Sequence, residues 1–267
     1  MPAIRILFLT DTHLGYDLPF RPRIQRRRRG PEFFSNFKQA LDDAVSLKVD
    51  AIIHGGDLFY RSKVPPRLVE LVFEPLKRVA GTGIPVFIVP GNHERSFIPH
   101  SEFSFHPNLH VFTAPQTFRL EIKGRTLTIS GFPFIRENIR DNFIGVVNQT
   151  NWRQHKVDCR ILCIHQTVEG ATVGPSGYTF RHGRDVIRAK DVPSHFSAVL
   201  AGHIHRFQVL RKDLRGKAIR AAVFYAGATE RVSFAERDEE KGYLIFNIDL
   251  DEQYNLPQVE WEFRTLP

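Results

Sequence analysis

Short apolar runs, each closed by polar residues, recur along the first half of the chain. Residues 4–9, 50–54 and 84–89 have the length and composition of strands buried on both faces of a sheet. Between them lie two stretches in which apolar residues recur every three or four positions, the spacing of a helix with one buried face. In the first helix, which begins at Gly30 and Pro31, the apolar residues are Phe33, Phe37, Leu41, Ala44 and Val45. Strands that alternate with helices predict a parallel sheet.

The second half of the chain has a different pattern. Residues 118–132 alternate apolar and polar around Lys123 and Gly124, which is typical of a hairpin, and residues 137–155 predict an amphipathic helix. Further buried strands are predicted at 160–164 and 197–201, followed by hairpins. No internal repeat or low-complexity linker interrupts the chain. We therefore expect one α/β domain over residues 1–267 that contains two sheets.

Residues able to bind a metal follow five of the predicted strands. They are Asp11, His13, Asp57, Asn92, His93, His165, His203 and His205. In α/β sheets the carboxyl ends of the strands face one crevice where ligands bind, so these side chains are expected to converge. A structural role is the alternative for any single histidine, but five such motifs in order favour one common site.

The chemistry of this set points to two metal ions. Carboxylate, amide and imidazole donors without a thiolate suit Mn²⁺, Fe²⁺ or Zn²⁺. Seven ligands are too many for one tetrahedral ion but enough for two ions that share a bridging carboxylate. Two metals about 3.5–4 Å apart stabilise the attacking and leaving oxygens of an in-line displacement, the chemistry of phosphoesterases and nucleases.

The net charge of +8 is concentrated in one segment. Residues 21–29 carry six arginines and no acid. Arginine clusters of this kind bind phosphate backbones, and a solvated face is the alternative interpretation. Arg181, in a glycine-rich loop after His165, is a further candidate with the same alternative. The candidate substrate contacts are Arg26, Arg27, Arg28, Arg29 and Arg181.

Taken in order, the motifs resemble those of the calcineurin-like metallophosphoesterase superfamily. The chain carries them as Asp11-Thr12-His13, Gly56-Asp57, Gly91-Asn92-His93-Glu94, His165 and Gly202-His203-Ile204-His205. Within the superfamily it is most similar to the SbcD-type nuclease subunit of the double-strand-break repair complex. That similarity also includes residues 11–15, 56–59, 230–234 and 239–243.

The resemblance implies a four-layer αββα sandwich of two mixed β-sheets flanked by helices. It assigns Asp11, His13, Asp57 and His205 to one metal, and Asp57, Asn92, His165 and His203 to the other. Mn²⁺ is the first expectation for both ions, with Fe²⁺ or Zn²⁺ as alternatives. His93 would protonate the leaving oxygen or stabilise the transition state. The attacking group would be a metal-bound hydroxide, since no serine or cysteine recurs among the motifs.

The expected function is that of a DNA exonuclease or endonuclease acting in DNA repair, with sequence-independent contacts to the phosphate backbone. A phosphoesterase for small molecules or phosphoproteins is the alternative for the same dinuclear site. A non-catalytic scaffold is a third hypothesis, which the complete ligand set argues against.

Four further features bear on substrate contacts, partners and location. Nucleases of this branch usually continue into a DNA-capping domain and a helical segment that grips an SMC-type ATPase, but this chain stops at Pro267, so neither is expected here. Tyr60 stands where the branch often has a histidine. Cys159 and Cys163 would lie about 13 Å apart in one strand, too far for a disulfide. Without a signal peptide or membrane segment, a cytoplasmic protein is expected.

Overall fold

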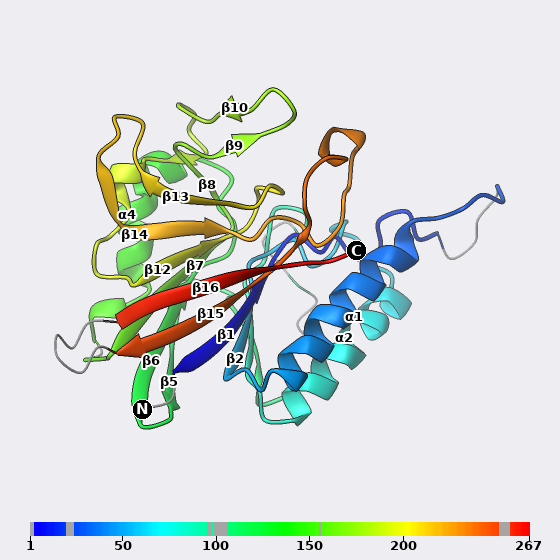
Figure 1. Ribbon diagram of the computed structural model, residues 1–267, viewed down its shortest axis with the longest axis horizontal. Helices are drawn as coiled ribbons and strands as arrows, with labels where there is room; N and C mark the ends of the chain where they lie inside the picture. Colours follow the sequence, from blue (N-terminus) through cyan, green and yellow to red (C-terminus); the bar gives the residue numbers. More distant parts are fainter. Residues whose placement is uncertain (1–2, 20–23, 95–97, 99–105, 155, 251–256) are drawn as a thin grey trace.

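The structure is a computed structural model that describes residues 3–19, 24–94, 98, 106–154, 156–250 and 257–267. Two six-stranded sheets pack face to face, as Figure 1 shows. Helices α1 (Gly30–Ser46) and α2 (Pro66–Gly81) cover the outer face of the first sheet. Helix α4 (Ile139–Gln149) covers the outer face of the second. The four-layer sandwich implied by the resemblance is confirmed, whereas the single-domain boundary stays a prediction.

The first sheet combines a parallel centre with an antiparallel hairpin at one side. Its strand order is β16-β15-β1-β2-β3-β4. The parallel strands are β1 (Ile4–Leu9), β2 (Ala51–His54), β3 (Val86–Ile88) and β4 (Leu109–Val111). The hairpin strands are β15 (Gly242–Leu250) and β16 (Pro257–Thr265). Because β15 pairs antiparallel with β1, the sheet is mixed.

The second sheet has the order β13-β14-β12-β7-β6-β5 and is also mixed. Its strands are β5 (Gln116–Ile122), β6 (Arg125–Gly131), β7 (Cys159–Ile164), β12 (Ala198–Ala201), β13 (Gln208–Lys212) and β14 (Ala218–Tyr225). β5 and β6 form the predicted hairpin, in which Lys123 and Gly124 both have positive φ, as a tight turn requires. The pairs β6–β7, β7–β12 and β12–β14 are parallel.

Short strands and 3-10 helical turns lie in the connections between these strands. They are β8 (Thr167–Val168), β9 (Thr172–Val173), β10 (Tyr178–Thr179), β11 (Val186–Ile187), η1 (Trp152–Gln154), η2 (Ala189–Asp191) and η3 (Phe234–Glu236). The predicted helix over 137–155 is too long, because Asn151 takes a φ of 59° after α4 and only the turn η1 follows. Its predicted last residue, His155, lies outside the described residues.

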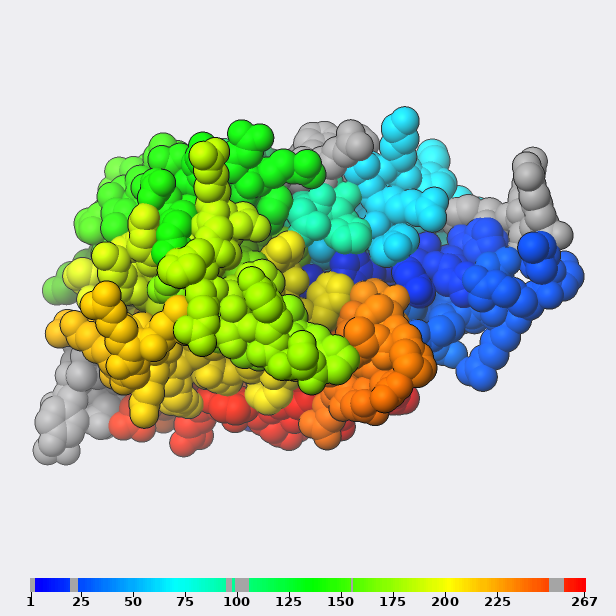
Figure 2. All heavy atoms as spheres, turned by 90° about the horizontal axis from the view of Figure 1, so that it is seen from above, coloured from blue at the N-terminus to red at the C-terminus, as the bar shows by residue number. Residues whose placement is uncertain are grey.

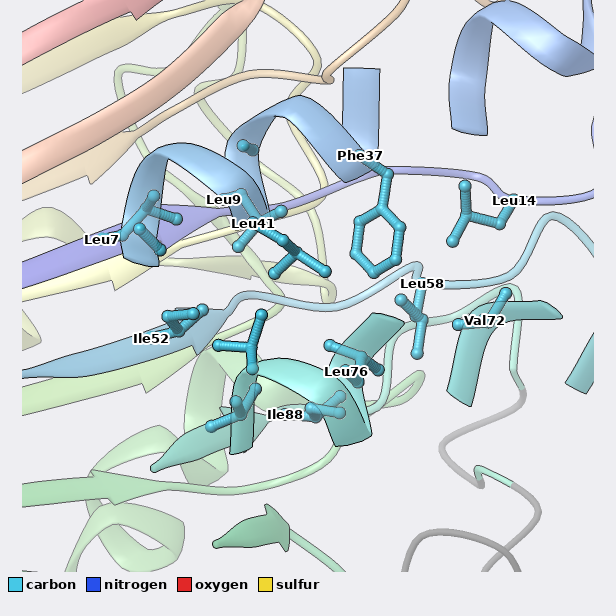
Figure 3. Packing of buried hydrophobic residues seen from close by; sticks show 14 of the residues in the cluster. Leu7, Leu9, Leu14, Phe37, Leu41, Ile52, Leu58, Val72, Leu76 and Ile88 are labelled. Atoms are coloured by element: carbon cyan, nitrogen blue, oxygen red, sulfur yellow. The ribbon is translucent and has the colours of Figure 1, made fainter. Parts of the chain in front are cut away.

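Alternation along β1 explains why its apolar run is continuous. Ile6 and Phe8 face the second sheet, whereas Leu7 and Leu9 face α1 and α2. Figure 3 shows Leu7, Leu9 and the helical residues packed together. The apolar face predicted for α1 is confirmed except at Val45, which is 38% exposed, because the buried stripe passes through Ala44 beside it.

The layers bring the carboxyl ends of β1, β2, β3, β7 and β12 to one edge of the sandwich. Figure 2 looks onto this edge, where the yellow residues after β12 lie between the yellow-green segment around β10 and the orange segment of residues 230–240.

Cys159 and Cys163 are buried free thiols in β7, so the prediction that they do not bond is confirmed. In the described parts of the chain, no helix has both the length and the apolar character to cross a membrane.

Candidate metal centre

Unusual backbone conformations place the predicted ligands. Asp11, His13, Asp57 and His203 all have positive φ, between 45° and 82°. Such conformations cost a non-glycine residue about 1–3 kcal/mol and cluster at functional sites. Here they turn the chain sharply at the ends of β1, β2 and β12, so that each side chain points back across the strand ends.

Two glycines permit the loops to pack closely at this point. A Cβ on Gly91 would lie 2.1 Å from Asp57 Oδ1, and a Cβ on Gly56 would lie 2.2 Å from His165 Nδ1. Gly56 also has a φ of 109°, which disfavours any side chain. The glycines of the Gly-Asp and Gly-Asn-His motifs therefore leave room for the ligands themselves.

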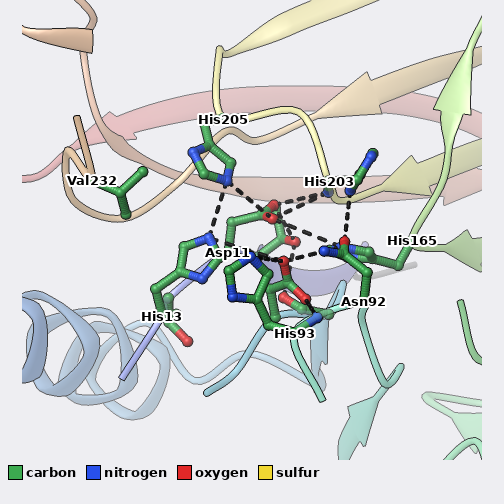
Figure 4. A network of polar contacts seen from close by, with 12 residues as sticks. Asp11, His13, Asn92, His93, His165, His203, His205 and Val232 are labelled. Carbon is green, nitrogen blue, oxygen red and sulfur yellow. Dashed lines mark hydrogen bonds and ion pairs between the residues drawn. The ribbon is translucent and has the colours of Figure 1, made fainter. Parts of the chain in front are cut away.

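All eight predicted residues lie together, in two halves on either side of two carboxylates. Figure 4 shows His13, His93 and His205 on one side of the Asp11 carboxylate and Asn92, His165 and His203 on the other. In the first half, Nε2 of His13 lies 3.0 Å from Nε2 of His205, which is itself 3.7 Å from Asp11 Oδ1. Two imidazole nitrogens this close beside a carboxylate can share a cation.

The second half is centred on the Asn92 side-chain oxygen. Asn92 Oδ1 lies 2.7 Å from His203 Nδ1 and 3.1 Å from His165 Nε2. Nε2 of His165 also lies 3.4 Å from Asp57 Oδ2. Asp57 Oδ2 is in turn 4.0 Å from His13 Nε2 in the first half. Asp57 therefore faces both halves, the position that a bridging carboxylate needs.

Hydrogen bonds outside the centre fix how three imidazoles point. Nδ1 of His165 donates to the Gly55 main-chain oxygen at 2.8 Å, and Nδ1 of His205 donates to Glu236 at 3.2 Å. Nδ1 of His93 donates to the main-chain oxygen of Tyr60 at 2.6 Å. In each case Nε2 is left facing the carboxylates, which is how metal-binding histidines are oriented by outer partners.

The carboxylates are held by donors as well. Asp57 Oδ1 accepts from the His93 main-chain N–H at 2.9 Å, and Asp11 accepts from the Thr10 hydroxyl at 2.7 Å. Asp11 also accepts from the His203 main-chain N–H at 3.1 Å. These contacts fix Asp11 and Asp57 in place while leaving oxygen lone pairs free to bind a cation.

Burial and charge act in opposite directions on the titrating groups. Burial would raise the pKa of Asp57, but the nearby charge of His165 holds it well below its usual value. Burial would lower the pKa of His165, but attraction to Asp57 raises it to about 9. Burial lowers the pKa of His203 to about 3 and that of His13 well below its usual value. His13 and His203 are therefore neutral, the form that binds metals.

The donor set fits divalent cations. Three groups have ligand atoms that all lie within 4.8 Å of one another: Asp11 with His13 and His205, Asp11 with Asp57 and His165, and His13 with Asp57 and His93. Nitrogen and oxygen donors suit Mn²⁺, Fe²⁺ and Zn²⁺, and neutral imidazoles beside two buried carboxylates attract positive charge. The side chains of His93 and His205 are 33% and 25% exposed, whereas those of Asp57 and His13 are almost fully buried.

Residues 4–207 match the sequence profile of a family described as calcineurin-like phosphoesterase. The chain belongs to the calcineurin-like phosphoesterase family. The predicted superfamily is thus confirmed, and the Asp and His groups above are candidate ligands for the dinuclear metal site of a calcineurin-like phosphoesterase. Which residue binds which ion, and which metal is bound, stay predictions.

Curated relatives of this phosphoesterase include DNA double-strand break repair proteins named Mre11. The protein from Archaeoglobus fulgidus is 26% identical over 245 residues, which cover 87% of this chain and 52% of the relative. The protein from Methanococcus maripaludis is 22% identical over 263 residues, covering 94% of this chain and 65% of the relative. The phosphoesterase chain thus spans about half to two thirds of the length of these relatives.

A solved structure confirms the fold independently. A dimetal phosphatase from Danio rerio superimposes with a TM-score of 0.60 at 13% identity, covering 99% of this chain and 97% of that one. At this identity the comparison shows that the phosphoesterase shares the fold.

The described arginines of residues 21–29 are all engaged in ion pairs. The pairs are Arg26 with Asp17 at 2.6 Å, Arg28 with Asp17 at 3.0 Å, Arg27 with Glu32 at 2.9 Å, and Arg29 with Glu32 at 3.0 Å and Glu230 at 2.7 Å. Arg27 remains 88% exposed, and Arg181 is exposed just after β10. Arg21 and Arg23 lie outside the described residues. The DNA contacts stay a prediction.

Residues to which the sequence assigned no role support the phosphoesterase site. Glu94 accepts the main-chain N–H of Phe59 at 2.6 Å and of Gly91 at 2.7 Å, which ties the second motif loop to the third. Burial raises the Glu94 pKa to about 8. Glu236 contacts His205, and no local pattern marks it. The position of Glu94 directly after Asn92 and His93 is a signal that could have found it.

Proposed function

We propose that this chain is the catalytic part of a metal-dependent DNA nuclease that acts in DNA repair. One observation carries the proposal: five donors, from His13, Asn92, His165, His203 and His205, converge around the two buried carboxylates of Asp11 and Asp57, and the partly exposed imidazole of His93 lies beside them. Relatives named DNA double-strand break repair proteins, similar over most of this chain, support DNA as the substrate.

The ligand assignment follows the two halves of the site. Asp11, His13 and His205 would hold one ion, Asn92, His165 and His203 would hold the other, and Asp57 would bridge them. Divalent ions held by these residues would polarise a phosphodiester and lower the pKa of an attacking water. Mn²⁺ is the metal we propose, since mixed imidazole and carboxylate donors suit it.

His93 is placed to act on the substrate rather than on a metal. Its Nε2 lies 3.8 Å from Asp57 Oδ2, and its Nδ1 is fixed by the Tyr60 main-chain oxygen. Its side chain is 33% exposed, so a phosphodiester bound at the carboxylates can contact this imidazole. We assign His93 to protonating the leaving oxygen or to stabilising the charge that develops on the phosphoryl group.

The partners we propose are DNA and an SMC-type ATPase. Phosphate contacts from Arg27 and its neighbours would hold DNA without regard to sequence. The two free thiols suit a reducing cytoplasm.

The alternative is a phosphoesterase for small molecules or phosphoproteins that uses the same site. The structural likeness to a dimetal phosphatase is the observation that favours it. The purified chain with Mn²⁺ should be assayed on end-labelled linear duplex DNA, bis(4-nitrophenyl) phosphate and a phosphopeptide. Degradation of DNA supports the nuclease, whereas rapid turnover of either other substrate with intact DNA supports the alternative.

A further inference from the structure

A pocket of about 360 Å³ adjoins the metal centre on the side of His93. The chain segments that follow β1 and β2 continue side by side beyond the candidate metal ligands and form part of the wall of this pocket. Leu14 N–H donates to the Leu58 oxygen at 2.9 Å, and Tyr60 N–H donates to the Leu14 oxygen at 3.0 Å. The wall is therefore fixed to the same two loops that carry His13 and Asp57.

Tyr60 connects this pocket to the chemistry. Its ring lines the pocket, and the ring centroid lies 5.5 Å from that of His93 and 6.0 Å from that of His13. Tyr16 packs edge-on against Tyr60 with centroids 4.9 Å apart, which supports the ring from one side. A group inside the pocket is thus one aromatic ring away from the imidazole that faces the scissile bond.

The pocket combines apolar walls with a cationic rim. Its apolar lining consists of Leu14, Leu18, Pro19, Val64, Pro65 and Leu68. At the rim, the Arg61 guanidinium lies 5.7 Å from the Tyr60 ring centroid, and Lys63 is exposed. The one acidic residue in the lining, Asp17, is already paired with Arg26 and Arg28. The lining therefore carries net positive charge from Arg28, Arg61 and Lys63, while its apolar side chains suit an apolar group.

An apolar slot with an aromatic wall and a positive rim matches one nucleotide unit, whose base is flat and whose flanking phosphates are anionic. We propose that this pocket, the Tyr60 pocket, binds the nucleotide on the leaving side of the scissile phosphodiester. The base packs against Tyr60, and Arg61 and Lys63 contact the next phosphate. This inference rests on the proposed nuclease function and specifies which nucleotide of the substrate the site binds.

The proposed contact with the base comes from the Tyr60 side chain, so it can be removed without changing the backbone contact that orients His93. His93 is fixed by the main-chain oxygen of Tyr60, so Tyr60→Ala removes the ring without removing that hydrogen bond. Stacking of a base on an aromatic side chain changes binding by roughly 10-fold when the ring is lost. Tyr60→Phe keeps the ring and serves as the matched control.

The test uses short end-labelled oligonucleotides whose cut position is first mapped with the wild-type chain and Mn²⁺. An abasic residue is then placed on either side of the cut. We expect an abasic residue on the leaving side of the cut to lower kcat/KM about 10-fold and one on the other side to have little effect. Tyr60→Ala should lower kcat/KM on the intact strand by a similar factor and abolish the difference between the two sides, whereas Tyr60→Phe should retain both.

A binding measurement tests the same contact in variants whose activity is too low to assay. Fluorescence anisotropy of a labelled oligonucleotide in EDTA should give a weaker affinity for Tyr60→Ala than for Tyr60→Phe. Lys63→Gln should reduce the dependence of log affinity on log salt by about one unit, as loss of one phosphate contact does. Equal thermal stability of the variants excludes misfolding as the cause.

The outcomes separate this inference from the proposed function. If the wild-type chain cuts DNA but Tyr60→Ala keeps the wild-type response to abasic residues, the Tyr60 pocket does not bind the base. If the wild-type chain hydrolyses bis(4-nitrophenyl) phosphate but neither binds nor cuts any oligonucleotide, the nuclease proposal fails and the pocket proposal falls with it.

Discussion

Glu236 Oε1 lies 3.2 Å from Nδ1 of His205, a predicted metal ligand that comes 31 residues earlier in the chain. Lys241, which is fully buried, reaches the other Glu236 oxygen at 2.7 Å and the main-chain oxygen of His205 at 2.9 Å. The segment between β14 and β15 therefore supports the last metal motif from both its side chain and its backbone. Attraction to His205 and Lys241 overcomes burial and lowers the Glu236 pKa to about 2, so the carboxylate is charged at neutral pH.

Removing this charge should weaken one metal site. Glu236→Gln loses the carboxylate that orients His205, and loss of such outer partners lowers metal affinity about 10-fold or more. Isothermal titration calorimetry with Mn²⁺ should show one of two sites weakened and the other unchanged. Glu240→Gln, an exposed acid on the same segment, is the matched control and should bind like the wild type. Equal affinities for the two variants would remove the assigned role of Glu236.

Asp57 faces both halves of the site, so its replacement should weaken the binding of both metal ions. For the wild type, Mn²⁺ at 100 times its Kd should raise the free energy of unfolding by about 2.7 kcal/mol per site, and EDTA should reverse the effect. Asp57→Asn should lose this response, as thermal melts with Mn²⁺ and with EDTA would show. Asn92→Ala, which touches one half, should keep part of it. A full Mn²⁺ response in Asp57→Asn would argue against a bridging carboxylate.

The arginines just before α1 should have two different roles, one in DNA binding and one in stability. Arg27 is 88% exposed, and its pair with Glu32 is a surface ion pair of small worth. Arg29 joins α1 to Glu230 at 2.7 Å and to the Arg231 main-chain oxygen at 2.8 Å. We expect Arg29→Ala to lower stability by about 1–2 kcal/mol. Arg27→Ala should leave stability unchanged and weaken DNA binding.

Measurements of urea unfolding and of DNA affinity as a function of salt check the division. The Arg27 variant should reduce the salt slope by about one unit, as removal of a single phosphate contact does. An Arg27→Ala chain with wild-type DNA affinity would favour the other interpretation of the segment, a solvated face.

The sequence predicted that the candidate ligands converge, because each follows a strand of one of the two sheets. Asp11 and Asp57 are placed by β1 and β2 within two or three residues, and parallel strands bring such loops to one edge. Local pattern therefore sufficed to predict which side chains meet at the candidate metal centre and to predict the hairpin of β5 and β6, whereas the roles of these side chains as ligands stay a prediction. It also predicted the free thiols of β7 correctly.

The sequence could not predict the contacts that depend on packing between distant segments. Glu236 and Lys241 reach His205 across 31 and 36 positions, on a segment with little regular structure. Pairing of Arg26 and Arg28 with Asp17 depends on the path of a loop. The Tyr60 pocket likewise exists because the loops after β1 and β2 continue side by side, which no residue pattern specifies.

Digestion of labelled DNA by the wild type and by His93→Ala, side by side with Mn²⁺, tests the central claim most directly. The substrates are linear duplex, single-stranded and circular DNA, and calorimetry confirms that both proteins bind Mn²⁺. The account predicts that the wild type cuts DNA and that His93→Ala binds metal but cuts roughly 10²–10⁴-fold more slowly. Undigested DNA with the metal-loaded wild type, or equal digestion by both proteins, would contradict it.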